Sequence, residues 1–273
     1  MTKVSVVSTV YNGAEHIDQA ADSILRQDYE NYEWIILDDQ STDETPKKLS
    51  ALADSHDRVR VITPPERLGR APSLNEVVDI ADGHYIAQQD IDDISFPHRL
   101  SLQAEYLDDN SDVGVVGGYY ERIDQIRNEA YVREPPTEHE ELVKALASYI
   151  PFAHTLVMFR KEAWSDAGTY PEKEDLEDIC LWINMASRGW RLGNVPENLG
   201  KHFVYEESSW HRRYQYTRRQ RRLAKVQARA VSELDLPVWM YVYPAGRLLY
   251  PYLPTSLKRS VRRIVGGIRE REL

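Results

Sequence analysis

Blocks of apolar and polar residues alternate along the first ninety residues and predict strands and helices in turn. The run KVSVVST at 3–9 is β-branched and almost continuously apolar, which is typical of a strand buried on both faces of a parallel sheet. Further strands are predicted at 33–37, 58–62 and 85–87. Apolar residues at helical spacing predict helices at 15–27 and 72–81 between them. This alternation predicts a parallel α/β sheet with right-handed crossovers.

The second half of the chain continues this pattern less regularly. A strand is predicted at 113–120, and helices at 137–148 and 174–189. We therefore expect an α/β fold whose central sheet is mixed but mostly parallel and is flanked by helices. Beyond residue 210 the composition changes, which predicts a basic helical C-terminal extension.

Polar residues directly follow three of the predicted parallel strands. They are Thr9-Val10-Tyr11, Asp38-Asp39 and Asp90-Ile91-Asp92. Ligands of parallel α/β sheets bind beyond the carboxyl ends of the strands, so these segments should meet at one rim.

Asp90 and Asp92 lie two residues apart on an extended segment, so their side chains point to the same side. Two such charges about 5 Å apart repel each other by roughly 3 kcal/mol at an effective dielectric constant near 20. A cation between them would relieve the repulsion, and hard oxygen ligands suit Mg²⁺ or Mn²⁺. The alternative is a solvated acidic turn in which Asp93 or Ser95 caps the next helix.

Composition narrows the class of protein. The 273 residues are 42% hydrophobic and 29% charged, which suits one large or two small soluble domains. A single cysteine, Cys180, excludes an intramolecular disulfide and fits a reducing, cytoplasmic compartment. No long apolar run precedes Asn12-Gly13, so we expect no signal peptide, and no apolar run is long enough to predict a transmembrane helix.

The net charge of −10 conceals an asymmetry. Residues 201–273 carry 16 Lys or Arg and 6 Asp or Glu, a net charge of +10, so residues 1–200 carry −20. A nucleic-acid-binding domain would normally have a basic face on its folded body, so we expect no nucleic-acid partner. An acidic body suits either a metal site or adaptation to a salty cytoplasm, and a basic tail suits an anionic surface.

Several motifs together resemble glycosyltransferase family 2. They are VSVVSTVYN, WIILDDQSTDET, RLGRAPSLNEVVDIADGHYIAQQDIDDISFPHRL, and AHTLVMFRKEAW with LEDICLWINMASRGW. The resemblance covers roughly residues 3–210 and implies an inverting, nucleotide-sugar-dependent enzyme of the GT-A fold. It also implies a donor- and metal-binding half at 1–115 and an acceptor-side half at 116–209, followed by the extension at 210–273.

The resemblance implies roles for the residues at the rim. Thr9 and Tyr11 would seat the nucleotide base, and Asp39 would accept a base N–H such as uracil offers. Tyr11 would otherwise be a packed aromatic residue. Asp92 would bind the metal ion, and Asp90 would lie nearer the ribose while also facing the metal.

On the acceptor side, the resemblance makes Asp178 the general base, with Glu177 beside it. Their alternative role is to complement the dipole of the helix that they open. The resemblance also implies that residues 152–160 form the acceptor-side strand, which carries His154 and Thr155. His154 would hydrogen-bond the acceptor, or else be a structural histidine. Arg99 matches an arginine of the family, and we expect it to bridge carboxylates structurally.

Two departures from the family pattern affect these roles. Phe203 and Tyr205 stand where the family often has an arginine and a metal-binding histidine, which leaves Glu206 or His202 as substitutes for the third metal ligand. Processive members carry Gln-x-x-Arg-Trp, whereas here Arg219 stands in place of the tryptophan. We therefore expect an enzyme that adds one sugar and then releases its product.

The expected function is transfer of one sugar from a nucleotide-diphosphate sugar, a UDP-sugar being favoured, to a hydroxyl acceptor on a lipid-linked or surface glycan. One alternative is a phosphohydrolase of the haloacid-dehalogenase type, because Asp90-Ile91-Asp92 imitates its nucleophile motif with Asp90 as the nucleophile. Another is a degenerate transferase that only binds a membrane and partner proteins.

The C-terminal extension also allows two interpretations. Basic amphipathic segments flank the aromatic stretch at 239–252, which is typical of contact with the anionic cytoplasmic face of a membrane. The alternative is a helical hairpin packed on the catalytic domain or on a second copy of the chain.

Overall fold

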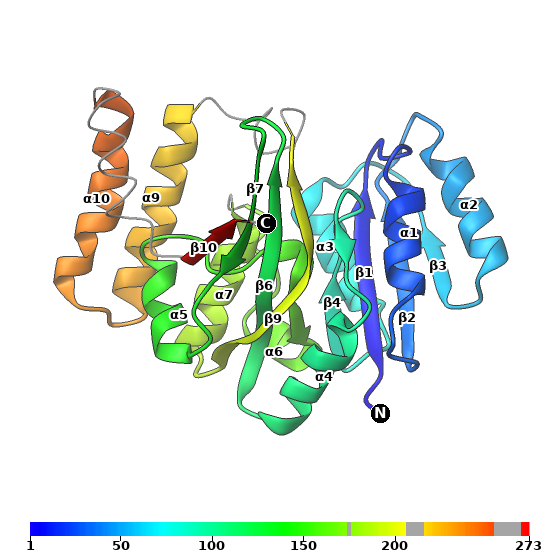
Figure 1. Cartoon of the computed structure of the whole chain (residues 1–273), viewed down its shortest axis with the longest axis horizontal. Helices are drawn as coiled ribbons and strands as arrows, with labels where there is room; N and C mark the ends of the chain where they lie inside the picture. The colour runs from blue at the N-terminus through cyan, green and yellow to red at the C-terminus, as the bar shows by residue number, and fades with distance from the viewer. Residues whose placement is uncertain (174–175, 206–215, 254–268, 273) are drawn as a thin grey trace.

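Four parallel strands form one side of the central sheet in a computed structural model that describes residues 1–173, 176–205, 216–253 and 269–272. They are β1 (Val4–Val10), β2 (Tyr32–Asp38), β3 (Val59–Ile62) and β4 (Tyr85–Gln88). The β1 strand pairs in parallel with both β2 and β4, and β2 pairs in parallel with β3. The predicted alternation of strands and helices is thus confirmed (Figure 1).

Helices cover both faces of these strands because the strands are apolar on both sides. One face packs against α1 (Ile17–Leu25), α2 (Thr45–Ser55) and α4 (Arg99–Asp109) through a single hydrophobic cluster. The other face packs against α3 (Arg70–Asp79) in a second cluster, which extends into the rest of the chain. The carboxyl ends of β1, β2 and β4 are left between these layers.

The sheet becomes mixed beyond β4. Its strand order is β10-β7-β6-β8-β4-β1-β2-β3, and β8 is antiparallel to both of its neighbours. The added strands are β5 (Ile94–Ser95), β6 (Val113–Asp124), β7 (Glu129–Glu134), β8 (Met158–Arg160), β9 (Arg191–Val204) and β10 (Arg269–Glu272). The long β9 runs parallel to β6 and pairs antiparallel with β5, directly beside the acidic motif.

The structure differs from the predicted strand at 152–160. Residues His154–Leu156 form the 3₁₀ helix η1, and only Met158–Arg160 form β8. The turn brings the Thr155 hydroxyl 3.0 Å from the backbone N–H of Asp90, from which it accepts a hydrogen bond. This hydrogen bond connects the predicted acceptor side to the acidic motif.

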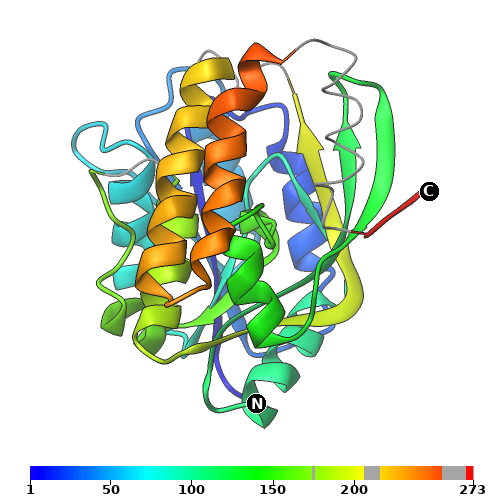
Figure 2. The ribbon, with the colours of Figure 1, turned by 90° about the vertical axis from the view of Figure 1, so that its left-hand side faces the viewer.

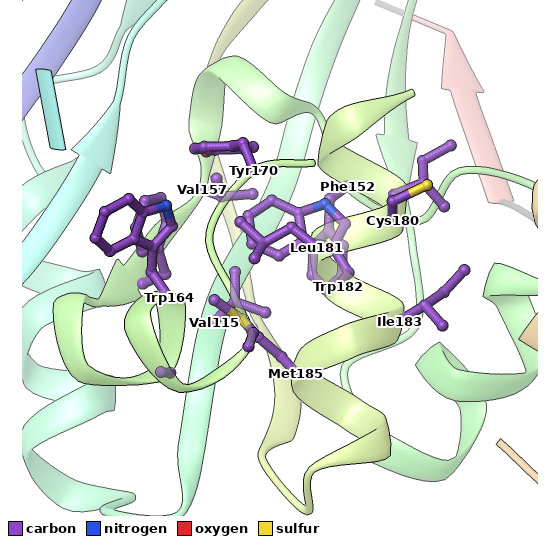
Figure 3. Packing of buried hydrophobic residues seen from close by; sticks show 14 of the residues in the cluster. Val115, Phe152, Val157, Trp164, Tyr170, Cys180, Leu181, Trp182, Ile183 and Met185 are labelled. Carbon is purple, nitrogen blue, oxygen red and sulfur yellow. The ribbon is translucent and has the colours of Figure 1, made fainter. Parts of the chain in front are cut away.

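Three helices cover the mixed side of the sheet. They are α5 (His139–Leu146), α6 (Lys161–Asp166) and α7 (Glu177–Ser187). Trp182 of α7 is fully buried, and its ring lies beside that of Phe152 (Figure 3), with 5.9 Å between the ring centroids. Its ring centroid is also 6.0 Å from that of Phe159. This aromatic packing holds α7 against the sheet and fixes the position of its first turn.

The described part of the C-terminal extension packs on the catalytic body. It comprises α9 (Tyr216–Glu233), η2 (Val238–Tyr241), α10 (Val242–Leu249) and η3 (Tyr250–Tyr252). Leu223, Val226 and Ala230 of α9 are buried in the same cluster as Trp182. The helices α9 and α10 lie side by side over that face (Figure 2).

The predicted basic amphipathic segment at 257–268 lies outside the described residues. Within the ranges that the structure describes, no helix combines the length and the apolar character needed to cross a membrane.

A buried arginine forms hydrogen bonds at the end of β4, next to the acidic motif. Arg99 is fully buried and donates hydrogen bonds to the backbone oxygens of Gln88 and Val157 at 2.7 and 3.0 Å. It also donates to the Ser95 hydroxyl and to the side-chain oxygens of Gln89 and Gln103. Burial lowers the pKa of Arg99 to about 9, so the guanidinium stays charged at neutral pH.

The role of Arg99 is therefore structural, as predicted, but its partners are neutral oxygens rather than carboxylates. The reason is that the backbone carbonyls of Gln88, at the end of β4, and of Val157, directly before β8, lie in the core, where a charged donor stabilises them.

Replacing Arg99 with methionine should lower the free energy of unfolding by about 3 kcal/mol or more, because several buried acceptors lose a charged donor. Urea denaturation of the two proteins measures this difference. Arg26→Met is the matched control, since the Arg26 side chain is 73% exposed and its loss should change stability by less than about 0.5 kcal/mol. Equal stability of the two variants would contradict a structural role for Arg99.

Candidate active site

Three carboxylates gather directly after β4. Ligand oxygens of Asp90, Asp92 and Asp93 lie within 4.8 Å of one another. The connection between β4 and β5 is short, so the three side chains stay close together. Contacts from β9 also hold Asp93 in place. The backbone N–H of Phe203 donates to one Asp93 oxygen at 2.7 Å, and His202 lies 3.1 Å from the other.

The surroundings shift the pKa values of Asp92 and Asp90 in opposite directions. Burial, followed by the neighbouring charges of Asp93 and Asp90, raises the pKa of Asp92 to about 7. Burial also favours the neutral form of Asp90, but Arg70 and His154 outweigh it and lower the pKa of Asp90. Among the described residues Asp92 has no ion pair, and a carboxylate beside two others fits a site for a divalent cation, for which Asp92 and Asp90 are the predicted ligands.

The structure describes one of the two residues expected as a substitute third metal ligand. His202 contacts Asp93, and burial alone would lower its pKa, but Asp93 raises it above the ordinary value. Glu206 lies outside the described residues. The Tyr205 hydroxyl lies 3.4 Å from the backbone oxygen of Asp92 and donates to it. Tyr205, directly after β9, thus contacts the acidic segment through its hydroxyl.

The predicted base-binding residues surround the ends of β1 and β2. Asp39 is buried and accepts hydrogen bonds from the backbone N–H groups of Leu68 and Gly69 at 2.7 and 3.0 Å. Each carboxylate oxygen has a second lone pair, so Asp39 can still accept a further N–H. Asp38 instead accepts from the backbone N–H of Ser41 at 3.0 Å and caps the following turn.

Tyr11 and Thr9 lie at the end of β1. Thr9 is partly buried in the register position opposite Leu37, and the exposed ring of Tyr11 extends beyond the strand. The guanidinium of Arg67 lies 3.5 Å from the Tyr11 ring centroid. Tyr11 therefore presents an aromatic surface at the rim, with a cation already stacked on it.

On the opposite side, α7 presents two acidic residues in its first turn. Leu176, in a left-handed conformation with φ 63°, immediately precedes the helix. Glu177 forms an ion pair with Arg70 at 2.6 Å. Among the described residues Asp178 has no ion pair. Burial, and secondarily Glu177, raises the pKa of Asp178 despite the opposing effect of His154.

Arg70 connects the two sides of the site. Its guanidinium lies 2.6 Å from Glu177, 3.2 Å from the Nδ1 atom of His154 and 3.7 Å from Asp90. No role for Arg70 was predicted from the sequence. The available signal was its position, because it follows β3 at the same sheet edge as the other polar segments.

His154 is a buried, neutral histidine in this arrangement. Arg70 donates to Nδ1, so Nε2 carries the proton and donates to the Tyr170 hydroxyl at 3.1 Å. Burial is the main cause of its lowered pKa. Both ring nitrogens therefore have protein partners, and the predicted contact of His154 with the acceptor stays a prediction.

Comparison with known proteins identifies the family. The sequence profile of Glycosyl transferase family 2 matches residues 5–168. The chain belongs to glycosyl transferase family 2. This family assignment confirms the predicted enzyme class, and it removes the phosphohydrolase alternative, in which Asp90 would be a nucleophile.

Relatives of this family-2 chain include the putative glycosyltransferase EpsE of Bacillus subtilis (strain 168). EpsE is 33% identical over 259 residues, which are 93% of this chain and 91% of EpsE. The UDP-Glc:alpha-D-GlcNAc-diphosphoundecaprenol beta-1,3-glucosyltransferase WfaP of Escherichia coli is 29% identical over 196 residues, covering 71% of this chain and 74% of WfaP.

Solved structures confirm the GT-A fold of this family-2 enzyme. The mannosyltransferase PcManGT from Pyrobaculum calidifontis, in complex with GDP-Man and Mn²⁺, aligns with a TM-score of 0.65 and 22% identity over 97% of this chain and 79% of PcManGT. S. aureus TarS 1–349 in complex with UDP-GlcNAc aligns with a TM-score of 0.68 and 17% identity over 95% of this chain and 74% of TarS.

The raised pKa of Asp92 predicts pH-dependent metal binding. Below pH 7 the Asp92 carboxyl holds a proton that a divalent cation must displace. MnCl₂, tested with and without UDP, should therefore raise the melting temperature more at pH 8 than at pH 5.5. Asp92→Asn should abolish most of this shift at both pH values. A wild-type shift that does not change with pH would contradict the assignment of Asp92.

The same pKa determines how Asp92 affects stability without metal. Because the folded carboxyl keeps its proton up to about pH 7, whereas the unfolded one releases it near pH 4, this group makes folding less favourable as the pH rises between these values. Metal-free Asp92→Asn should thus melt above the wild type at pH 8 and close to it near pH 4.

Proposed function

We propose that this enzyme transfers a single sugar, with inversion, from a nucleotide-diphosphate sugar to a hydroxyl acceptor, and that a UDP-sugar is the favoured donor. The observation that carries the proposal is the bridge made by Arg70. Its one guanidinium contacts Asp90 of the metal motif and Glu177 at the start of α7. A donor phosphate group near Asp90 would therefore lie close to the carboxylates of α7, because one Arg70 guanidinium contacts both sides.

The donor would lie along the rim of β1, β2 and β4. Asp39 would accept an N–H of the base, Tyr11 would stack on it, and Thr9 would line the site at the end of β1. Asp92 and Asp90 would hold a divalent ion, Mn²⁺ or Mg²⁺. Such an ion supplies Lewis-acid neutralisation of the diphosphate leaving group.

Asp178 is the general base in this proposal. It would take the proton of the acceptor hydroxyl while the oxygen attacks the anomeric carbon and the bond to the diphosphate breaks on the opposite face. Glu177 is less suited because Arg70 lowers its pKa against the effect of burial. The raised pKa of Asp178 brings it closer to the value at which a general base is effective.

The acceptor that we propose is a glycan carried on a lipid. The name of WfaP describes transfer to a sugar on diphosphoundecaprenol, and this chain is similar to 74% of that protein. Such an acceptor requires the enzyme to work at a membrane surface, and we propose the cytoplasmic face. Release after one addition agrees with Arg219 in place of the tryptophan of the processive motif.

Asp178→Asn should lower kcat by about 10²-fold or more while the affinity for the donor stays near that of the wild type, because the base acts in the chemical step. Steady-state kinetics with donor and acceptor, together with donor titration, measures the two effects separately. Glu177→Gln is the matched variant, which removes the neighbouring carboxylate and its ion pair with Arg70.

If Asp178→Asn lost donor binding, Asp178 would be a structural residue or a metal ligand. If Glu177→Gln alone lost the chemical step, the base would be Glu177.

A nucleotide panel tests the donor class. With Mn²⁺ present, UDP should stabilise the protein more than GDP or ADP at the same concentration. A hundredfold excess over the Kd stabilises by about 2.7 kcal/mol, which a thermal-shift experiment detects readily. Stronger stabilisation by GDP would replace UDP with GDP as the donor nucleotide and leave the transfer chemistry unchanged.

A further inference from the structure

The segment after α9 exposes an ordered row of apolar side chains. Five of them are 61–79% exposed, and we call them the outer stripe: Val238, Trp239, Val242, Leu249 and Tyr252. Four of the five, together with the exposed Ala245, are spaced by four, three, four and three residues along η2, α10 and η3. This spacing places them on one face of a nearly continuous helical segment.

The outer stripe is held outward by contacts on the opposite face. Met240 and Pro244 are buried, and Met240 belongs to the large core cluster. Arg247 donates to Gln227 at 2.8 Å, to Gln220 at 2.9 Å and to the backbone oxygen of Ser148 at 3.0 Å. The segment is thus anchored by its inner face, and among the described residues its outer face is mostly exposed.

A basic row lies next to the outer stripe on α9. Arg218, Arg221 and Lys225 are exposed and follow each other at spacings of three and four residues. The two helices pack side by side (Figure 2), and Arg221 donates to the Tyr252 hydroxyl at 3.5 Å. The sequence has no Asp or Glu from 236 to 268, so acidic residues interrupt neither the stripe nor the segment that follows it.

We propose that the outer stripe and the basic row together bind the surface of an anionic lipid bilayer. Aliphatic and aromatic side chains enter the interfacial region, while Arg and Lys beside them contact anionic headgroups. The net charge of −20 on residues 1–200 would be repelled by the same surface, which leaves the basic side of the molecule to face it.

The direction of α10 relates this surface to the active site. The helix runs in the same direction as β1, so its C-terminal end lies at the same end of the molecule as the strand ends that carry the site (Figure 1). A bilayer that covers the whole outer stripe would therefore extend to the end of the molecule that carries the rim. Vesicle binding needs no sugar donor, so its failure would be distinguishable from a failure of the proposed transfer reaction.

Co-sedimentation of the full-length protein with vesicles tests the proposal. The vesicles contain phosphatidylcholine alone or with 30% phosphatidylglycerol, at 50 and 500 mM NaCl. The first variant, Trp239→Ser/Val242→Ser/Leu249→Ser, removes the stripe, and Ile126→Ser is its control because Ile126 is an exposed apolar residue elsewhere. The second, Arg218→Gln/Arg221→Gln/Lys225→Gln, removes the basic row, and Arg26→Gln/Lys47→Gln/Arg188→Gln is its control of equal charge.

We expect the wild type to bind anionic vesicles at low salt and to bind less at high salt. Each basic side chain near the surface contributes about fivefold, so losing the row should weaken binding by about 100-fold. Loss of the stripe should weaken it at least tenfold, and both control variants should bind like the wild type. Melting temperatures within 2 °C of the wild type show that the variants are folded.

A single substitution keeps the test independent of the triple variants. Trp239→Tyr should abolish the change in tryptophan emission on vesicle addition while preserving most of the binding. Failure of the wild type to bind anionic vesicles, or equal binding by the stripe variant, would overturn the proposal. A dimer in sedimentation velocity that the stripe variant dissociates, without vesicle binding, would show instead that a second copy of the chain covers this surface.

Discussion

Repulsion among carboxylates at the rim of the sheet is the constraint on which the site depends. Five acidic side chains come from two segments, 90–93 and 177–178, and each needs compensation in a partly buried place. Arg70 compensates Asp90 and Glu177, and β9 compensates Asp93 through a backbone N–H and His202. Asp92 and Asp178 keep raised pKa values. These two are the carboxylates that the proposed chemistry assigns to a cation and to a proton.

The fold provides this unequal compensation through elements that are distant in the sequence. Because β9 pairs with both β5 and β6, it reaches Asp93 from more than 100 residues away. Because Trp182 is packed among aromatic residues, the first turn of α7 has a fixed position relative to Arg70. Packing in the core therefore holds the two segments that carry the carboxylates in place, although the carboxylates repel one another.

Sequence patterns predicted the parts of this arrangement that depend on local periodicity. The parallel strands, the acidic motif after β4 and the acidic start of α7 are all visible as runs or spacings. The strand β9 was not predicted, because RLGNVPENLGKHFV contains Gly, Pro and Asn and shows no alternation, and the structure has bulges there. Arg70 and Arg99 were missed or given the wrong partners because long-range packing, not neighbouring residues, decides which oxygens an arginine meets.

In the C-terminal extension, an amphipathic pattern does not by itself show whether an apolar face packs on the protein or binds a partner. The apolar residues of α9 pack into the core, so that helix is amphipathic because it folds onto the body. The apolar residues of the outer stripe are exposed in the described part of the chain, yet both sets have the same helical period in the sequence. Only burial separates them. Among the described residues, the inner face of the extension packs on the catalytic domain, whereas the outer face stays exposed. The two interpretations of the extension are thus compatible, since packing on the body is what orients the outer stripe.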